Sequence, residues 1–134
     1  MIFLGRKNKF LKTQGRSSFG ISFNNAMDGI EFALNHERNI KIEIFMGICA
    51  SILGFLLSIS VIEWAIIVLV IAMVLCLELV NTAIERAVDL TTKEYHELAK
   101  AAKDVSAGAV LVMSMFSVVV GIIIFLPKIL ILIK

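Results

Sequence analysis

One short stretch of the sequence, Leu77 to Leu90, carries the residue types that do chemistry. At 100° per residue on a helix, its polar side chains form one stripe: Glu78, Asn81, Thr82, Glu85 and Asp89. Glu78 and Glu85 are about 10 Å apart along the helix axis, which is too far for both to bind one metal ion directly. The spacing favours two separate roles, a carboxylate that accepts a proton and a carboxylate that binds Mg²⁺ together with phosphate oxygens.

The alternative interpretation is an ordinary solvated face, where a helix leaves a membrane. That interpretation explains Arg86 and Asp89, which lie at the end of the apolar pattern. It explains Glu78 poorly, because Glu78 lies about three turns earlier on the helix. An ionisable side chain at membrane depth is costly unless it is paired or hydrated.

The rest of the chain has the composition of a membrane protein. Of its 134 residues, 59% are hydrophobic and 18% are charged, and the mean hydropathy is +0.93. A membrane-spanning helix needs about 20 apolar residues. Three stretches meet this length, at about residues 42–62, 64–90 and 104–128. We therefore predict an all-α membrane protein with three transmembrane helices, in which residues 17–134 form one domain after a basic flexible tail at residues 1–16.

A further helix is predicted over residues 17–35, ahead of the first span. Its apolar residues recur at spacings of three and four: Phe19, Phe23, Ala26, Met27, Ile30 and Leu34. This pattern is typical of an amphipathic helix that lies in the membrane interface. Packing against the spanning bundle is an alternative that is compatible with it.

The positive charges predict the orientation in the membrane. Seven of the thirteen Lys and Arg residues precede Ile42, and four more lie between Arg86 and Lys103. The turn at residues 58–63 has none. By the positive-inside rule, the N-terminus and the loop at residues 90–104 face the cytoplasm, and the C-terminus faces outward.

Single residues in the apolar runs have simpler interpretations. Cys49 and Cys76 are expected to be small core residues and not a disulfide or metal pair. Trp64 is expected in an interfacial aromatic belt, and Pro127 to end or bend the third span. The sequence contains no Gly-rich phosphate loop, no zinc-ligand spacing and no nucleophile–His–Asp set.

Polar residues at the other two spans lie on the same predicted membrane face as the stripe. Glu37 precedes the first span, and Lys103 and Asp104 precede the third. Lys103 could meet a phosphate as a point charge, or only extend its ammonium group to the interface. Glu37 could join the site, or only pair with Lys41 one turn later.

These residues together resemble the prokaryotic diacylglycerol kinase family of small trimeric membrane kinases. The similarity is carried by "ELVNTAIERAVD" from Glu78 to Asp89, by "EYHELAK" from Glu94 to Lys100, and by "AKD" and "SAGAVL" after it. "NHERNIKIE", from Asn35 to Glu43, resembles the first block of the family. "SVIEW" and "FLPKI" are similar to the Gram-positive branch, whose members tend to be undecaprenol kinases.

The resemblance implies a domain-swapped homotrimer with shared active sites, with ATP as phosphate donor and Mg²⁺ as cofactor. It implies that Glu78 is the general base on a lipid hydroxyl, supported by Asn81, and that Glu37 and Glu85 bind the metal. Glu78 and Ser106 would contact the lipid substrate. The residues that would bind the nucleotide are Glu37, Glu85, Glu94, Tyr95, His96, Lys103, Asp104 and Asn25. Where the proteobacterial branch has an Arg and a Tyr on the surface helix, this chain has Ser18 and Asn25.

Two classes of function are compatible with this pattern. The first is an ATP-dependent lipid kinase that acts on undecaprenol, with diacylglycerol as the alternative acceptor. The second is a non-catalytic membrane carrier or scaffold that uses the acidic stripe to bind protons or cations. A carrier needs polar groups that continue toward the outer leaflet, and here only Ser51, Ser58, Ser114 and Ser117 do so. The one-sided stripe favours the kinase.

Overall fold

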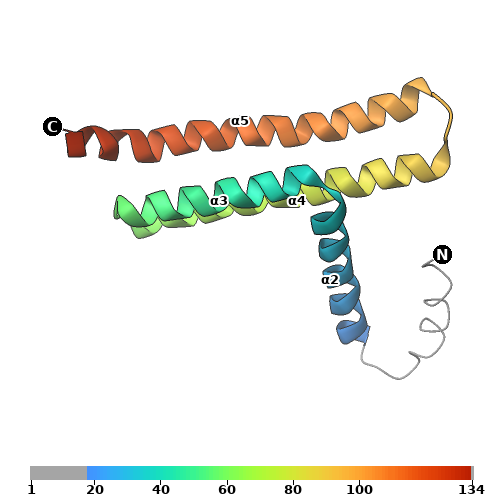
Figure 1. Ribbon diagram of the computed structural model, residues 1–134, viewed down its shortest axis with the longest axis horizontal. Helices are drawn as coiled ribbons and strands as arrows, with labels where there is room; N and C mark the ends of the chain where they lie inside the picture. Colours follow the sequence, from blue (N-terminus) through green and yellow to red (C-terminus); the bar gives the residue numbers. More distant parts are fainter. Residues whose placement is uncertain (1–17, 134) are drawn as a thin grey trace. The chain divides into compact units, whose positions relative to one another are not determined.

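The structure is a computed structural model that describes residues 18–133. These residues form four helices and no strand: α2 (Ser18–His36), α3 (Arg38–Leu56), α4 (Val61–Thr91) and α5 (Glu97–Ile133) (Figure 1). Within the described range, α3, α4 and α5 are long and apolar enough to cross a membrane. The predicted all-α class with three spanning helices is confirmed, while the tail predicted at residues 1–16 lies outside the described residues.

The chain divides into two units between Phe32 and Ala33. In the first unit, α2 carries the apolar side chains of the predicted amphipathic face, and Phe19, Phe23 and Met27 are exposed on it. The second unit begins at Ala33 and contains α3, α4 and α5. All side chains of the candidate site except Asn25 belong to this second unit.

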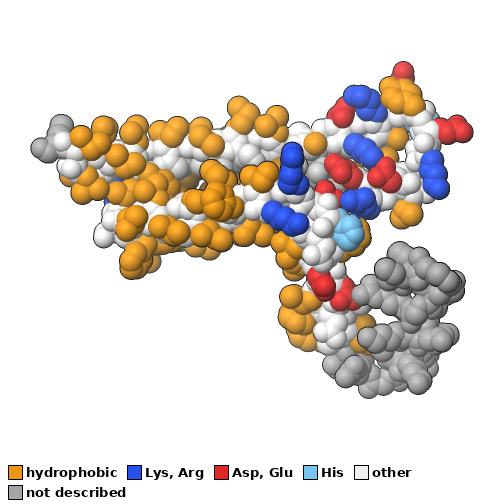
Figure 2. Space-filling model, in the orientation of Figure 1, with side chains coloured by type: hydrophobic (Ala, Val, Ile, Leu, Met, Phe, Trp, Pro, Cys, Tyr) orange, Lys and Arg blue, Asp and Glu red, His pale blue; other side chains and the backbone are white. Residues whose placement is uncertain are grey.

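In the second unit, α4 is the central element. It packs along both α3 and α5, whereas α3 and α5 contact each other little (Figure 1). Its buried apolar core is small and consists of Ile59, Ile67, Ile124 and Phe125, with partly buried neighbours around them. Most other large apolar side chains are exposed along the bundle (Figure 2). Apolar surface of this extent is suited to contact with lipid tails or with partner helices.

This exposure corrects the expectation for the two cysteines. Cys49 and Cys76 are both exposed, and neither forms a disulfide. The reason is that lipid-facing positions of a spanning helix are as apolar as core positions, so an apolar run does not identify the core. Trp64 is partly buried and packs against the core. Pro127 lies inside α5, which continues to Ile133, so it does not end the helix.

The turn between α3 and α4 has two helix caps. The Ile59 N–H donates to the Gly54 carbonyl at 3.2 Å, and the Ser58 N–H donates to the Phe55 carbonyl at 3.2 Å. This is a Schellman motif, with Ser58 in the left-handed conformation (φ 49°) that usually selects glycine. Ser60 then caps α4, since its Oγ accepts from the Glu63 N–H and Glu63 Oε2 accepts from the Ser60 N–H. These caps explain why α3 ends at Leu56, earlier than expected from hydropathy.

Charged side chains gather at the opposite end of the bundle, where α4 ends and α5 begins (Figure 2). At the capped end the Lys128 ammonium group contacts Glu63 Oε2 at 3.1 Å, which joins the start of α4 to the end of α5. The bundle therefore has one end rich in charges that belong to the candidate site and another end fixed by caps and an ion pair.

The turn provides a test of the fold. Gly54→Ala should lower the free energy of unfolding by about 1–3 kcal/mol, because a Cβ there would lie 2.9 Å from Ile59 Cδ1 and 3.3 Å from the Trp64 ring. Ser58→Gly should raise it by about 1 kcal/mol, because glycine adopts the left-handed conformation without strain. Thermal unfolding in detergent micelles measures both. Gly29→Ala is the control, since no described atom lies within 4 Å of its Cβ position, and equal effects of Gly54→Ala and Gly29→Ala would contradict the packing argument.

Candidate active site

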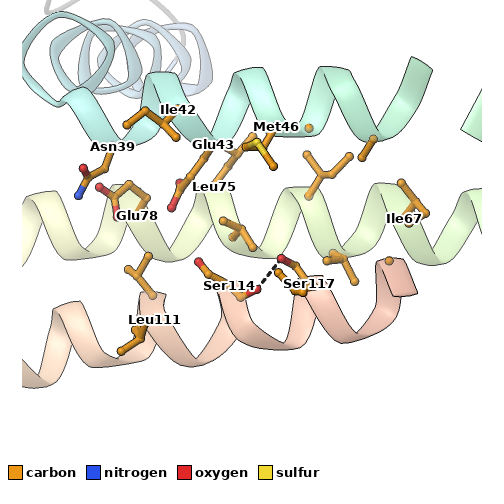
Figure 3. A pocket seen from close by; sticks show the side chains of 18 of the residues that line it. Asn39, Ile42, Glu43, Met46, Ile67, Leu75, Glu78, Leu111, Ser114 and Ser117 are labelled. Atoms are coloured by element: carbon orange, nitrogen blue, oxygen red, sulfur yellow. Dashed lines mark hydrogen bonds between the residues drawn. The ribbon is translucent and has the colours of Figure 1, made fainter. Parts of the chain in front are cut away.

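Glu78 is the most deeply buried member of the predicted stripe. Its side chain lies on α4 facing α3 and is only 2% exposed, which makes it the largest fully buried side chain of the described residues. Asn39 of α3 points toward it, with its amide within hydrogen-bonding reach of the carboxyl (Figure 3). A buried carboxyl needs such a partner, because removal from water without one is costly. Asn39 was not predicted, since only the packing of α3 on α4 brings the two residues together.

The stripe grades from buried to exposed toward the end of α4. Asn81 and Thr82 are buried, Glu85 is partly buried, and the Asp89 side chain is 53% exposed. The same helix therefore carries a carboxyl away from water and another one at the aqueous end. This gradation is the arrangement that the sequence pattern predicted.

Asn81 joins α4 and α5 in one polar network. Ser106 of α5 donates its hydroxyl to Asn81 Oδ1 at 2.7 Å, with the Lys103 carbonyl as a second acceptor at 2.9 Å. The Asn81 amide in turn donates to Glu85 Oε1 at 3.3 Å. Asn81 is thus an orienting residue between α5 and the Glu85 carboxyl.

Glu43 is a site residue that sequence reasoning noted only as part of a family block. It lies on α3, and its carboxyl enters the same space between α3 and α4 as Glu78 (Figure 3). Its Oε2 is buried and has no hydrogen-bond partner among the described residues. The sequence shows that Glu43 lies six residues after Glu37 in the same family block. It does not show that the rotation of α3 about its axis directs the Glu43 side chain toward Glu78.

Glu37 lies at the N-cap of α3 and contacts α4. Its Oε1 accepts from Arg86 Nη2 at 2.6 Å, and this is the ion pair in place of the contact with Lys41 considered above. Glu37 and Glu85 are both near enough to Glu78 for their charges to act on it. The three carboxylates that the sequence assigned to the base and the metal therefore gather at the charged end of the bundle.

A second group of predicted residues lines a groove of about 580 Å³ around the α4–α5 connection. The predicted nucleotide residues found there are Glu94, Tyr95, His96, Lys103 and Asp104. Of the three lysines that line this groove, the two on α5 form ion pairs, Lys103 with Asp89 and Lys100 with Asp104. Asn25 belongs to the other unit, and its role in nucleotide binding stays a prediction.

His96 has a structural contact that explains part of its position. Its Nδ1 accepts from the Leu98 N–H at 3.2 Å, so the ring caps the start of α5. Thr92 similarly closes the preceding turn, because its Oγ1 accepts from the Glu94 N–H at 3.2 Å. These local contacts fix the loop backbone that forms one wall of this groove.

The resemblance implied a Mg²⁺ ion bound by Glu37 and Glu85, and oxygen donors of the kind that Mg²⁺ prefers are present. The described residues contain no group of three or more His, Cys, Asp or Glu side chains placed to hold a metal ion. Mg²⁺ does not require such a cage, since it is usually bound by one or two carboxylates together with water and substrate phosphates. Glu37 and Glu85 offer hard oxygen ligands of this kind at the aqueous end of the stripe.

A long apolar groove of about 580 Å³ runs along α3, α4 and α5 and ends at Glu78. Its polar end is formed by Asn39, Glu43, Glu78 and Asn81. The remaining lining is apolar or small and includes Met46, Gly47, Ala50, Ile67, Val74, Leu75, Leu111, Ser114, Ser117, Gly121 and Phe125 (Figure 3). Such a groove is suited to a hydrocarbon chain whose polar end reaches the buried carboxyl.

Comparison with known proteins identifies the class. The sequence model of the prokaryotic diacylglycerol kinase family matches residues 24–125, so the chain belongs to this family and is a lipid kinase. It is 49% identical over 107 residues to an undecaprenol kinase of Bacillus subtilis (strain 168), which covers 80% of this chain and 87% of that protein. It is 42% identical over 111 residues to a diacylglycerol kinase of Synechocystis sp., covering 82% of this chain and 63% of that protein. A diacylglycerol kinase of Escherichia coli (strain K12) is 30% identical over 91 residues, covering 68% and 75%.

The family assignment confirms the resemblance recognised in the sequence and the prediction of a lipid kinase. It also removes the carrier as a competing class. The roles of individual site residues are not settled by membership of the family, so they remain predictions that the geometry supports to different degrees.

The polar network makes a prediction about stability. Ser106→Ala should lower the free energy of unfolding by about 1–3 kcal/mol, because Asn81 Oδ1 would remain buried without its donor. Thermal unfolding in detergent measures the loss. Ser117→Ala is the matched control on the same helix, since its hydroxyl donates only to the Ser114 carbonyl one turn earlier, and its effect should stay within about 0.5 kcal/mol. Equal losses for the two variants would contradict the network.

Proposed function

We propose that the protein transfers the γ-phosphoryl group of ATP to the hydroxyl of a membrane lipid, and that the lipid is undecaprenol. The observation that carries this proposal is the buried Glu78 carboxyl at the polar end of an apolar groove. A hydroxyl at the end of a hydrocarbon chain in that groove would meet Glu78. The nucleotide groove around Lys103 lies at the aqueous end of the same helix pair.

In the proposed reaction, Glu78 accepts the proton of the lipid hydroxyl. The hydroxyl oxygen forms a bond to the γ-phosphorus, and the bond from that phosphorus to the bridging oxygen of ADP breaks. Phosphoryl transfer depends on positioning and charge stabilisation more than on covalent chemistry by the protein. Mg²⁺ held by Glu37 and Glu85 would neutralise charge on the phosphates. Asn81 would orient Glu85, and Ser106 would orient Asn81.

The polar end of the groove supports undecaprenol over diacylglycerol. A diacylglycerol brings two ester carbonyls next to its hydroxyl, and each would need a donor if buried. The groove offers carboxyl oxygens from Glu43 and Glu78, which accept when ionised, and amide groups from Asn39 and Asn81. The Asn81 amide already donates to Glu85. A polyprenol has only its hydroxyl to satisfy, and the relative with 49% identity is named for that substrate.

We further propose that the enzyme is a homotrimer in the bacterial plasma membrane, with shared active sites. Its N-terminus and the loop at residues 90–104 would face the cytoplasm, where ATP is found. The exposed apolar surface of the bundle supports association or lipid contact.

The acceptor is tested by a side-by-side assay. Purified protein in mixed micelles with labelled ATP should phosphorylate undecaprenol with a kcat/KM at least about tenfold above that for diacylglycerol, a difference of about 1.4 kcal/mol. Equal or better use of diacylglycerol would replace undecaprenol as the assigned acceptor. Absence of transfer to both lipids would contradict the proposed acceptor class.

The base assignment is tested by Glu78→Gln. Removal of the proton acceptor should reduce kcat at least about 100-fold, while MgATP binding changes less than about twofold. Glu63→Gln is the matched control, with the same substitution at the other end of α4, and should retain near-normal turnover. Near-normal lipid phosphorylation by the folded Glu78→Gln variant would show that Glu78 is not the base.

A further inference from the structure

Arg86 is a charged residue that the proposed reaction does not use. It follows Glu85 on α4, and its Nη2 donates to Glu37 Oε1 at 2.6 Å. The Arg86 side chain is 47% exposed and the Glu37 side chain 20% exposed, so the pair lies at the aqueous edge of the bundle. The contact joins residues that are 49 positions apart in the sequence.

Stability alone is a weak reason for this pair. An ion pair in a half-exposed position contributes about 0–1 kcal/mol in general. The pair does, however, decide where the Glu37 carboxyl lies. Glu37 is the N-cap residue of α3, yet its side chain makes no capping hydrogen bond and is directed to Arg86 instead.

The charges around Arg86 show what its guanidinium group would do. Glu37 and Glu85 both act electrostatically on Glu78, so three carboxylates gather where a polyphosphate must approach. Two of the three lysines that line the nucleotide groove form ion pairs within that groove, Lys103 with Asp89 and Lys100 with Asp104. Arg86 therefore brings a positive charge to the carboxylate side of the site.

A guanidinium group is well suited to this task. Its planar fork of N–H donors can bind a carboxylate and a phosphate, and it is charged at all physiological pH values. We propose that Arg86 is a positioning and phosphate-binding residue, whose guanidinium group orients the Glu37 carboxyl and binds a terminal phosphate oxygen of MgATP. This inference rests on the proposed function, because it requires that MgATP is the donor.

The experiment is equilibrium binding of MgATP and MgAMP by calorimetry, on the full chain in detergent. Arg86→Gln should weaken MgATP binding about tenfold, because a charge-assisted hydrogen bond is lost, and should leave MgAMP binding within about twofold. Arg86→Lys, which keeps the charge but loses the planar fork, should lie between them. The Mg²⁺ concentration for half-maximal MgATP binding should rise in Arg86→Gln, since Glu37 is no longer oriented.

Arg38→Gln is the matched control, an exposed arginine on α3 next to Glu37, and should bind both nucleotides like the unsubstituted protein. Unchanged MgATP affinity in Arg86→Gln would overturn the inference. Equal weakening of MgATP and MgAMP would also overturn it, because that result indicates a structural role. If the unsubstituted protein bound no MgATP, the proposed function would fail instead, so the two failures are distinguishable.

Discussion

The burial of the Glu78 carboxyl in an apolar helix bundle is the constraint on which the rest of the site depends. At 2% exposure it cannot be hydrated as a surface carboxylate is, and an uncompensated charge there would be expensive. Two features compensate for the burial of this carboxyl. The Asn39 amide lies beside it, and the apolar groove that ends at Glu78 could admit a lipid hydroxyl. An ionisable group at this depth marks a functional site, and proton transfer from a lipid alcohol is the role proposed for it.

The neighbouring polar groups follow from that placement. Asn81 and Ser106 form a hydrogen-bonded connection across α4 and α5, which keeps Glu85 oriented about two turns beyond the buried carboxyl. Glu37 reaches the same region from the start of α3 because Arg86 holds it there. The contacts of Ser106 with Asn81 and of Arg86 with Glu37 cross between helices, so the polar groups of the site also contribute to the packing of the bundle.

Much of this was accessible from the sequence. The stripe on α4 follows from helical periodicity alone, and its gradient from Glu78 to Asp89 is present in the structure. The all-α class and the spanning helices follow from hydropathy. The family motifs led to the lipid kinase class, which the match over residues 24–125 confirms.

The remainder depended on information that a sequence pattern does not contain. The sequence pattern is compatible with Arg86 as a solvated residue, because its partner Glu37 is 49 positions away in the sequence. The sequence does not show that Glu43 lines the same groove as Glu78, because this depends on the rotation of α3 against α4. Cys49 and Cys76 are exposed and not in the core as expected. The reason is that lipid-facing surfaces and protein interiors select the same apolar residues.

The length of α4 has a consequence for how the enzyme fits its membrane. Its 31 residues extend about 46 Å, well beyond a hydrocarbon thickness of about 30 Å. If Glu63 marks one boundary, Glu78 lies about 22 Å from it and Glu85 about 33 Å, so the hydrocarbon edge falls between the two carboxylates. Bilayers differ in thickness by a few Å. A thicker bilayer would place Glu78 farther from the aqueous boundary, and a thinner one would place it nearer. The thickness of the surrounding bilayer thereby becomes part of the enzyme's active-site geometry.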